Sequence, residues 1–391
     1  MGITYFKSLS AAGFAATAIS YGPGRVGFGL FVPEFSTTFS MSATAVGLVS
    51  SLGFSGFLIA LLIAQALLER RGPEAPVLCG LGAATIGIGI VTVAPNVPVL
   101  AIGVFFAAAS AGFAWTPFND AVHRKIRDVD RPTALSEIST GTSLGIAGAG
   151  LAAMIMVYTG VTWRSCWAFF MLASAAAFVA NWRALRQVEK APDVTATHRW
   201  RSLWAASAVP LFALAFVYGT TSAIFISFAA KHMSQRGGVP GVDVAATPAL
   251  VFICLGAFGL VGLLAGRLRQ GLGLVWLLRL VLLAGMGSVL LVAAAPNTWA
   301  GLVGASGLQG VHIMVTSAIL AFWSERLFPG LPARSFTAAL LASAVGSVLG
   351  PAVAGTLYDT HGAELMFVAT AALPAILLTV LRDRHIQETP A

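Results

Sequence analysis

Charged side chains are scarce in this chain of 391 residues. Asp, Glu, Lys and Arg make up 10% of the sequence, against about 25% in an average soluble protein, and 57% of the residues are hydrophobic. A chain so poor in charge cannot cover a soluble domain with polar groups, which excludes an ordinary soluble fold. The composition indicates an all-α, polytopic membrane protein.

Sequence patterns for catalysis or metal binding are missing as well. Cys79, Cys166 and Cys254 lie singly in apolar runs, without the spacing of a disulfide framework or a metal site. Residues 22–27 match G-x-G-x-x-G, but they follow no strand and open no βαβ unit, so they do not indicate a nucleotide site. No Walker loop or nucleophile–base arrangement is present. We therefore expect a protein that is not an enzyme and uses no cofactor or metal.

The net charge of +8 is spread over short connections between apolar runs and forms no long basic segment. Membrane proteins concentrate lysine and arginine in cytoplasmic loops, which explains this charge without a nucleic-acid partner. If both termini are cytoplasmic, 19 of the 23 lysines and arginines fall on the cytoplasmic face and three, including Lys231, on the opposite face. The asymmetry predicts an even number of spans in the inner (cytoplasmic) membrane.

A spanning helix needs ~20 mostly apolar residues. Turns rich in charge, proline or asparagine divide the chain into twelve such runs, at 8–33, 44–68, 75–95, 97–119, 135–158, 163–183, 203–229, 246–267, 274–295, 298–324, 335–357 and 363–381. The longest polar segment, 183–202, separates the sixth run from the seventh. We expect two six-helix bundles, 1–182 and 203–391, joined by a cytoplasmic linker over 183–202.

The second half of the chain repeats features of the first at offsets of 197, 201 and 205 residues. The matches are Tyr21, Gly22, Phe28 and Phe31 with Tyr218, Gly219, Phe225 and Phe228, then Leu67 and Gly72 with Leu268 and Gly273, then Gly141, Gly145 and Gly150 with Gly346, Gly350 and Gly355. Ordered matches predict parallel repeats about a pseudo-two-fold axis normal to the membrane, with a substrate held near mid-membrane. For Gly141 with Gly145, and for Gly346 with Gly350, we expect close helix crossings.

The connection between the second and third runs, residues 67–72 with the sequence LLERRG, carries a family resemblance. Together with twelve runs and a central basic linker, it resembles the major facilitator superfamily over essentially the whole chain. Gln65, Glu69 and Pro73 depart from the family pattern Gly-x-Leu-x-Asp-Arg-x-Gly-Arg. The pattern Tyr-Gly-x-Gly-Arg…Pro of the first run is most similar to the bacterial branch labelled YbfB/YjiJ-like. The resemblance implies a cytoplasmic gate formed by Glu69, Arg70 and Gly72; a solvated loop is the alternative.

Arg25 stands inside the first apolar run, between glycines 22, 24, 27 and 29. An arginine at mid-membrane is unfavourable by roughly 2.5–3.5 kcal/mol, so its side chain should face a bundle interior or a hydrated cavity. Two interpretations follow. The guanidinium either binds an anion, for which its bidentate geometry suits a carboxylate, or fixes the first helix to carbonyl groups of neighbouring helices.

Further candidates for substrate binding meet one of three criteria. They share a helical face with Arg25, they occupy repeat-matched positions in the second half of the chain, or they place polar or aromatic groups within other apolar runs. They are Tyr21, Phe28, Trp115, Asn119, Tyr218, Ser222, Phe225, Gln309 and His312. For the aromatic residues, lipid-facing or interfacial positions are the alternative. His312, because an unperturbed histidine titrates near neutral pH, and Glu137 are candidates for proton coupling, with structural contacts as the alternative for both.

The sequence favours a secondary active transporter that moves a small organic solute, an organic anion or carboxylate, by alternating access. Its partners would be the anionic substrate, the lipid bilayer and, in the case of proton symport, protons; we expect a monomer. The alternative is efflux of neutral or hydrophobic compounds with a structural Arg25. A receptor or scaffold that transports nothing is a third class, but no sensory or signalling domain accompanies the apolar runs.

Overall fold

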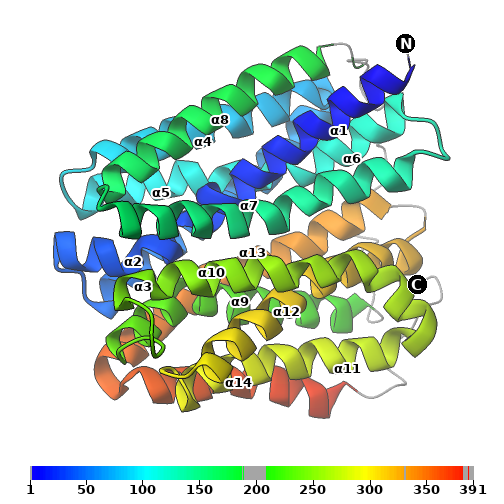
Figure 1. The fold of residues 1–391 in the computed structure, drawn as a ribbon. Helices are drawn as coiled ribbons and strands as arrows, with labels where there is room; N and C mark the ends of the chain where they lie inside the picture. Colours follow the sequence, from blue (N-terminus) through cyan, green and yellow to red (C-terminus); the bar gives the residue numbers. More distant parts are fainter. Residues whose placement is uncertain (1, 187, 189–207, 330–331, 382–385, 387–391) are drawn as a thin grey trace. The chain divides into compact units, whose positions relative to one another are not determined.

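The computed structural model describes residues 2–186, 188, 208–329, 332–381 and 386, and these residues form helices and no strand. In lipid every backbone N–H and C=O needs an internal partner, which a helix supplies within itself. The helices, drawn in Figure 1, are α1 (Gly2–Ile19), the π-helix η1 (Ser20–Val26), α2 (Gly27–Phe39), α3 (Ala43–Arg71), α4 (Glu74–Val93), α5 (Val97–Gly112), α6 (Trp115–Lys125), α7 (Arg131–Thr159), α8 (Trp163–Leu185), α9 (Val209–Gln235), the 3₁₀-helix η4 (Val244–Ala246), α10 (Thr247–Gly259), the 3₁₀-helix η5 (Leu260–Leu264), α11 (Ala265–Ala294), α12 (Trp299–Leu327), α13 (Pro332–His361) and α14 (Ala363–Val380).

Within the described ranges, ten helical stretches are long and apolar enough to cross a membrane. One of them, Val244–Ala294, has 51 residues, more than twice the ~20 that one crossing requires. Its backbone leaves the helical conformation at Gly273, with φ 76° and ψ 163°. The first helical stretch, interrupted by η1, is not among the ten. The count of twelve crossings therefore stays a prediction.

Large apolar side chains are exposed along the helices. Ile86 on α4 is 61% exposed, Leu151 on α7 is 55% exposed and Val353 on α13 is 66% exposed. Soluble monomers seldom expose many such residues together, whereas helices in a bilayer present them to lipid tails. This pattern agrees with a multi-pass membrane protein.

The chain folds into two compact units, Met1–Phe31 with Leu52–Ala196 and Val32–Ser51 with Thr197–Ala391. Helix α3 thus contributes its first residues to the second unit and the remainder to the first. The bundles expected from the sequence, 1–182 and 203–391, stay a prediction. In the expected linker 183–202, residues 187 and 189–202 lie outside the described ranges.

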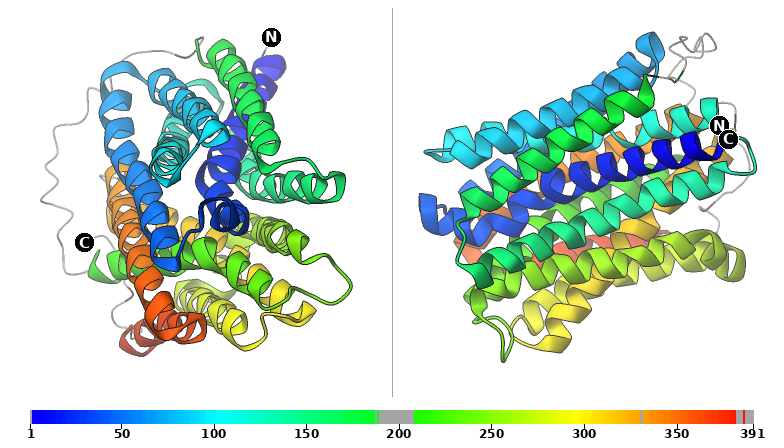
Figure 2. Two further views of the ribbon diagram at one scale, coloured as in Figure 1. Left: turned by 90° about the vertical axis from the view of Figure 1, so that its left-hand side faces the viewer. Right: turned by 45° about the horizontal axis from the view of Figure 1, so that its top comes forward.

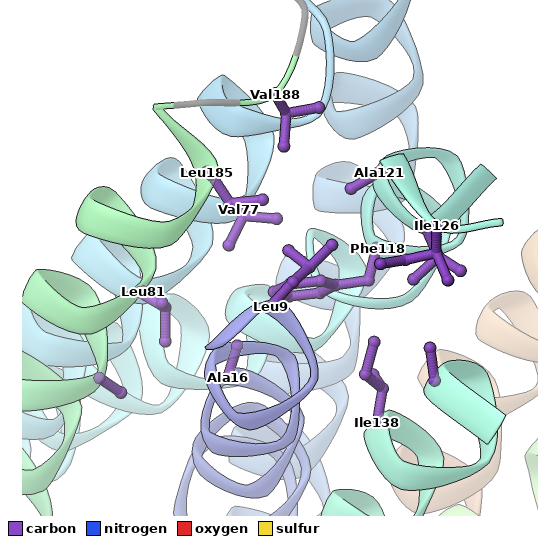
Figure 3. Packing of buried hydrophobic residues seen from close by; sticks show 13 residues of the cluster. Leu9, Ala16, Val77, Leu81, Phe118, Ala121, Ile126, Ile138, Leu185 and Val188 are labelled. Atoms are coloured by element: carbon purple, nitrogen blue, oxygen red, sulfur yellow. The ribbon is translucent and has the colours of Figure 1, made fainter. Parts of the chain in front are cut away.

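In the first unit, α1 packs against α7 and α8, and α4 packs against α5 and α8 (Figures 1 and 2). Figure 3 shows the buried cluster where α1, α4, α6, α7 and α8 meet. Leu9 of α1, Leu81 of α4, Phe118 of α6, Ile138 of α7 and Leu185 of α8 are each at most 1% exposed there. One apolar cluster therefore fixes five helices of this unit.

In the second unit, α9 packs along α13, while α12 packs against both α10 and α11. The α9–α13 crossing is close because a Cβ atom added to Gly219 would lie 1.9 Å from the Ser343 carbonyl oxygen, and one added to Gly346 would lie 2.3 Å from that of Phe216. The first unit has the same kind of crossing, since a Cβ on Gly145 would lie 2.3 Å from the Ala18 carbonyl oxygen. The expected glycine-mediated crossings are confirmed at Gly145 and Gly346.

The helix of the seventh apolar run extends further than the sequence predicted. The seventh run was expected to end at residue 229, but α9 continues to Gln235 and includes Lys231. Its side chain is only 6% exposed, and its Nζ atom donates to the Met41 carbonyl oxygen at 3.5 Å. Ala230 and Met233, before and after Lys231, are buried as well.

Candidate functional site

Arg25 lies in the π-helix that interrupts the first helical stretch. Pro23, inside η1, lacks an N–H and its ring crowds the preceding turn, which breaks the regular α-helical pattern. Gly24 lets α5 come close, because a Cβ atom there would lie 2.7 Å from Ser110 Oγ and 3.0 Å from the Ala107 carbonyl oxygen. Single π-turns of this kind recur at functional sites in helices.

Three aromatic rings surround the guanidinium of Arg25. Its Cζ atom lies 4.3 Å from the ring centroid of Phe57 and 5.7 Å from the centroids of Tyr21 and Phe54. Tyr21 precedes Arg25 by four residues, and the expectation that the two share a helical face is confirmed by this contact. Each ring at such a distance contributes about 0.5–2 kcal/mol of cation–π attraction.

The rings attract the charge of Arg25, but the face of a ring is not an oxygen atom that could accept a hydrogen bond. The five N–H groups of the guanidinium therefore form no conventional hydrogen bond with the ring faces. Among the described residues, no carboxylate or carbonyl group forms an ion pair or hydrogen bond with this guanidinium. Arg164 of the same unit differs, since it stacks on Trp163 at 4.1 Å and also donates to the Ala94 carbonyl oxygen at 2.8 Å. Arg25 is partly exposed and keeps its donors for a bidentate acceptor such as a carboxylate.

Four of the predicted residues come together in the second unit, between α9 and α12. Gln309 Nε2 donates to Ser222 Oγ at 3.3 Å, and the ring centroids of Tyr218 and His312 lie 5.7 Å apart. His312 Nδ1 lies 2.7 Å from the Val281 carbonyl oxygen of α11. Gln309 and His312 are fully buried, and Ser222 is 4% exposed.

The remaining residues predicted to bind substrate are Phe28, Phe225, Trp115 and Asn119. Phe28 and Phe225 are buried, at 5% and 1% exposure. Trp115, at the start of α6, packs against the apolar cluster of Figure 3, and Asn119 lies one turn further along the same helix. Their part in substrate binding stays a prediction.

The other coupling candidate, Glu137, and the gate candidates lie at or near helix ends. Glu137 is exposed in the second turn of α7. Glu69 Oε1 accepts from Gln65 Nε2 at 2.8 Å, Arg70 is exposed, and Gly72 ends α3 with a φ of 72°. A gating role for these residues stays a prediction.

Sequence reasoning missed Phe54 and Phe57, which provide two of the three rings around Arg25. They stand in the segment Gly53-Phe54-Ser55-Gly56-Phe57, where two glycine–aromatic pairs recur three residues apart. That spacing puts both rings on one face of α3 and both glycines beside them, and it is the signal that marks this face for close approach. The glycines do carry close contacts, since Cβ atoms on Gly53 and Gly56 would lie 2.8 Å from Val104 Cγ1 and 2.3 Å from the Phe105 carbonyl oxygen.

A model of the family described as "Major Facilitator Superfamily" matches residues 13–287, which is more than half of the chain. The chain belongs to the Major Facilitator Superfamily. Solved structures of similar fold include a mutant of the nucleoside transporter NupG, with a TM-score of 0.74 at 12% identity over 96% of this chain and 98% of that one. A bacterial homolog to the human lysosomal transporter Spinster, inward-facing and unoccupied, has a TM-score of 0.72 at 15% identity over 96% of each chain.

At these identities the two structures show only that this chain shares their fold. No curated protein matches the sequence. Membership in the Major Facilitator Superfamily makes the chain a multi-pass membrane transporter of small molecules and not an enzyme.

Proposed function

We propose that this member of the superfamily is a secondary active transporter for a small organic anion, with Arg25 as the group that binds its carboxylate. The supporting observation is the environment of the Arg25 guanidinium. It lies in an apolar helix, faces three aromatic rings and has no oxygen partner among the described residues. A charge left in this state favours any visiting oxyanion that can accept two of its N–H groups.

The rings explain how Arg25 persists when no anion is bound. Insertion of arginine into a membrane is unfavourable by roughly 2.5–3.5 kcal/mol, and cation–π contacts of about 0.5–2 kcal/mol each offset much of this. The rings leave the N–H groups of Arg25 unused. A visiting anion can therefore bind these groups without competing against a carboxylate of the protein. Reversible binding is what a transporter requires, because the ligand must also leave.

The finer features of the transporter belong to the same proposal. We propose twelve crossings in two six-helix bundles with cytoplasmic termini, an inner-membrane location, alternating access, a monomeric state and membership in the YbfB/YjiJ-like branch. Phe28, Trp115, Asn119, Tyr218, Ser222, Phe225, Gln309 and His312 stay proposed substrate-binding residues with Tyr21. His312 and Glu137 stay candidates for proton coupling, and Glu69, Arg70 and Gly72 for the cytoplasmic gate.

The test compares Arg25 with Arg164, another ring-stacked arginine of the first unit. Purified wild type, Arg25→Lys, Arg25→Gln and Arg164→Gln are screened for thermal stabilisation by organic acids, and the best ligand is assayed for uptake into proteoliposomes. We expect Arg25→Lys and Arg25→Gln to lose both responses, because neither side chain offers a charged bidentate fork. Arg164→Gln should lose stability but keep its ligand response. Normal transport by Arg25→Gln would contradict the proposal.

Efflux of neutral or hydrophobic compounds is the second candidate, and the apolar ring cluster of Phe54, Phe57 and Tyr21 is the observation that favours it. The same stability screen includes lipophilic cations, neutral drugs and, because one similar structure is of a nucleoside transporter, nucleosides. Stabilisation by these compounds that survives in Arg25→Gln would favour the second candidate over the first.

A further inference from the structure

Helix α12 carries a row of four polar residues inside the second unit. Ser306, Gln309, His312 and Thr316 are spaced three, three and four residues apart, so they lie on one helical face. All four are 0% exposed. At a rise of ~1.5 Å per residue the row extends over roughly 15 Å, about half of a bilayer's hydrocarbon core.

Each of these residues has a buried atom without a hydrogen-bond partner among the described residues: Ser306 Oγ, Gln309 Oε1, His312 Nε2 and Thr316 Oγ1. Buried polar atoms are nearly always paired in native proteins, and leaving one unpaired is strongly unfavourable. Four such atoms on one face of one helix form a continuous polar row and not isolated exceptions.

The two hydroxyl groups of the row do not use the partner that the helix itself offers. A buried serine or threonine in a helix commonly donates to the carbonyl group four residues earlier. Thr221 does so on α9, to Val217 at 2.8 Å, and Thr370 does so on α14, to Met366 at 2.8 Å. Because Ser306 and Thr316 forgo this bond, their side chains are set for another partner.

The chemistry of the two middle residues shows what that partner must supply. The Val281 carbonyl only accepts, so His312 Nδ1 carries the proton at this 2.7 Å contact and Nε2 of the neutral ring is an acceptor. Gln309 Oε1 is an acceptor as well, because the amide nitrogen donates to Ser222 at 3.3 Å. Two acceptors cannot satisfy each other, and neither the Ser306 nor the Thr316 hydroxyl donates to them, so the described side chains leave the row without the donors that it needs.

We infer that a row of bound water molecules lies along this face of α12 and joins Ser306, Gln309, His312 and Thr316. Water supplies two donors and two acceptors at each position, and buried water typically bridges polar groups that lack a protein partner. Through Gln309 the row meets Ser222 of α9, which gives the interior of the second unit a hydrated, hydrogen-bonded path. The inference does not depend on which solute the transporter moves.

Wild-type protein gives the first test, so that folding of a variant is not at issue. In lipid bilayers, with ¹⁵N-labelled histidine, magnetisation transfer from water to the His312 imidazole is measured by solid-state NMR, and His312→Gln identifies the signal. We expect transfer to the His312 ring as rapid as that to the exposed His361. A His312 ring that receives no transfer from water would overturn the inference.

The second test uses near-isosteric changes and a matched control. Thr316→Val and Ser306→Ala should each lower the midpoint of thermal unfolding by roughly 2 °C, because each removes a hydroxyl bound to water. Thr221→Val, equally buried but bonded to its own helix, should change the midpoint less. If the hydroxyls of the row are truly unpaired, their removal stabilises the protein, and a midpoint that is raised or unchanged overturns the inference.

Discussion

Asp359 near the end of α13 holds the backbone of Thr44 near the start of α3: its Oδ2 atom accepts a hydrogen bond from the Thr44 N–H at 2.7 Å, across 315 residues of sequence. Its Oδ1 atom accepts a second bond from the Ala43 N–H at 3.1 Å. Ser42 Oγ completes the cap by accepting from the Ala45 N–H at 3.1 Å. The first N–H groups of a helix lack internal partners, and a carboxylate there also interacts favourably with the helix dipole.

Removal of this carboxylate should loosen the start of α3. We expect Asp359→Ala to reduce the free energy of unfolding by about 1 kcal/mol, the usual loss for a helix cap, and Asp359→Asn to reduce it by less. Hydrogen exchange of the Ala43 and Thr44 amides should accelerate in Asp359→Ala. Asp243→Ala removes the cap of η4, where Asp243 accepts from the Ala245 N–H at 2.9 Å, and serves as the control that leaves those two amides unchanged. Equal exchange in wild type and Asp359→Ala would show that the contact does not form.

The starts of several helices could be predicted because local capping residues define them. Asn96, Thr162 and Thr298 each precede an apolar run, and their side chains accept from the Val99, Ser165 and Gly301 N–H groups. The bounds expected there, 97, 163 and 298, agree within one residue with α5, α8 and α12. The end of α9 could not be predicted, because burial of Lys231 depends on Met41, far away in the sequence.

The candidate site shows the same division between local and long-range information. Helical spacing was sufficient to place Tyr21 beside Arg25, since both belong to one turn. Contacts between helices were not accessible in this way: Phe57 reaches Arg25 from α3, and Gln309 reaches Ser222 from α12. Neither pairing leaves a periodic pattern in the sequence, although Arg25, Gln309 and Ser222 were each singled out as polar groups within apolar runs.

Gly72 and Gly273, matched in the internal repeat, both have backbone conformations that a residue with a side chain rarely adopts. Their φ angles are 72° and 76°, where a side chain is strained by about 1–2 kcal/mol. At Gly273 the ψ angle of 163° adds to this, because that region is almost exclusive to glycine. We expect Gly72→Ala to destabilise the protein and Gly273→Ala to destabilise it more, measured by reversible unfolding in detergent.

Gly148 provides the control for these glycines. It lies inside α7, and a Cβ atom built on it has no neighbour within 4 Å. Gly148→Ala should therefore be neutral or stabilising by up to ~1 kcal/mol, through helix propensity alone. A loss of stability in Gly148→Ala as large as that in Gly273→Ala would show that the φ angle is not the cause.

Phe57 should stabilise the charge of Arg25 by cation–π interaction more than Phe54 does. Both rings are buried, but the guanidinium Cζ lies 4.3 Å from the Phe57 centroid and 5.7 Å from that of Phe54. A double-mutant cycle isolates each contact from the packing loss: Phe57→Leu and Phe54→Leu are measured in wild type and in Arg25→Gln. We expect a coupling energy of about 0.5–2 kcal/mol for Phe57 and a smaller one for Phe54. A coupling near zero for both would mean that the rings only fill space.

Gly285 on α11 makes room for the imidazole of His312. A Cβ atom built on Gly285 would lie 2.8–3.0 Å from three atoms of that ring, so Gly285→Ala must displace it and weaken the bond to Val281. We expect a loss of about 1–3 kcal/mol in the free energy of unfolding, together with a changed ¹⁵N chemical shift of His312. Gly287→Ala, two residues along the same helix, is the control, since its Cβ would meet Leu308 Cδ1 at 3.4 Å, ordinary van der Waals contact. In a His312→Ala background the effect of Gly285→Ala should disappear, because the added Cβ atom then has no imidazole ring to clash with. An undiminished loss of stability in that background would place the cause elsewhere on α11.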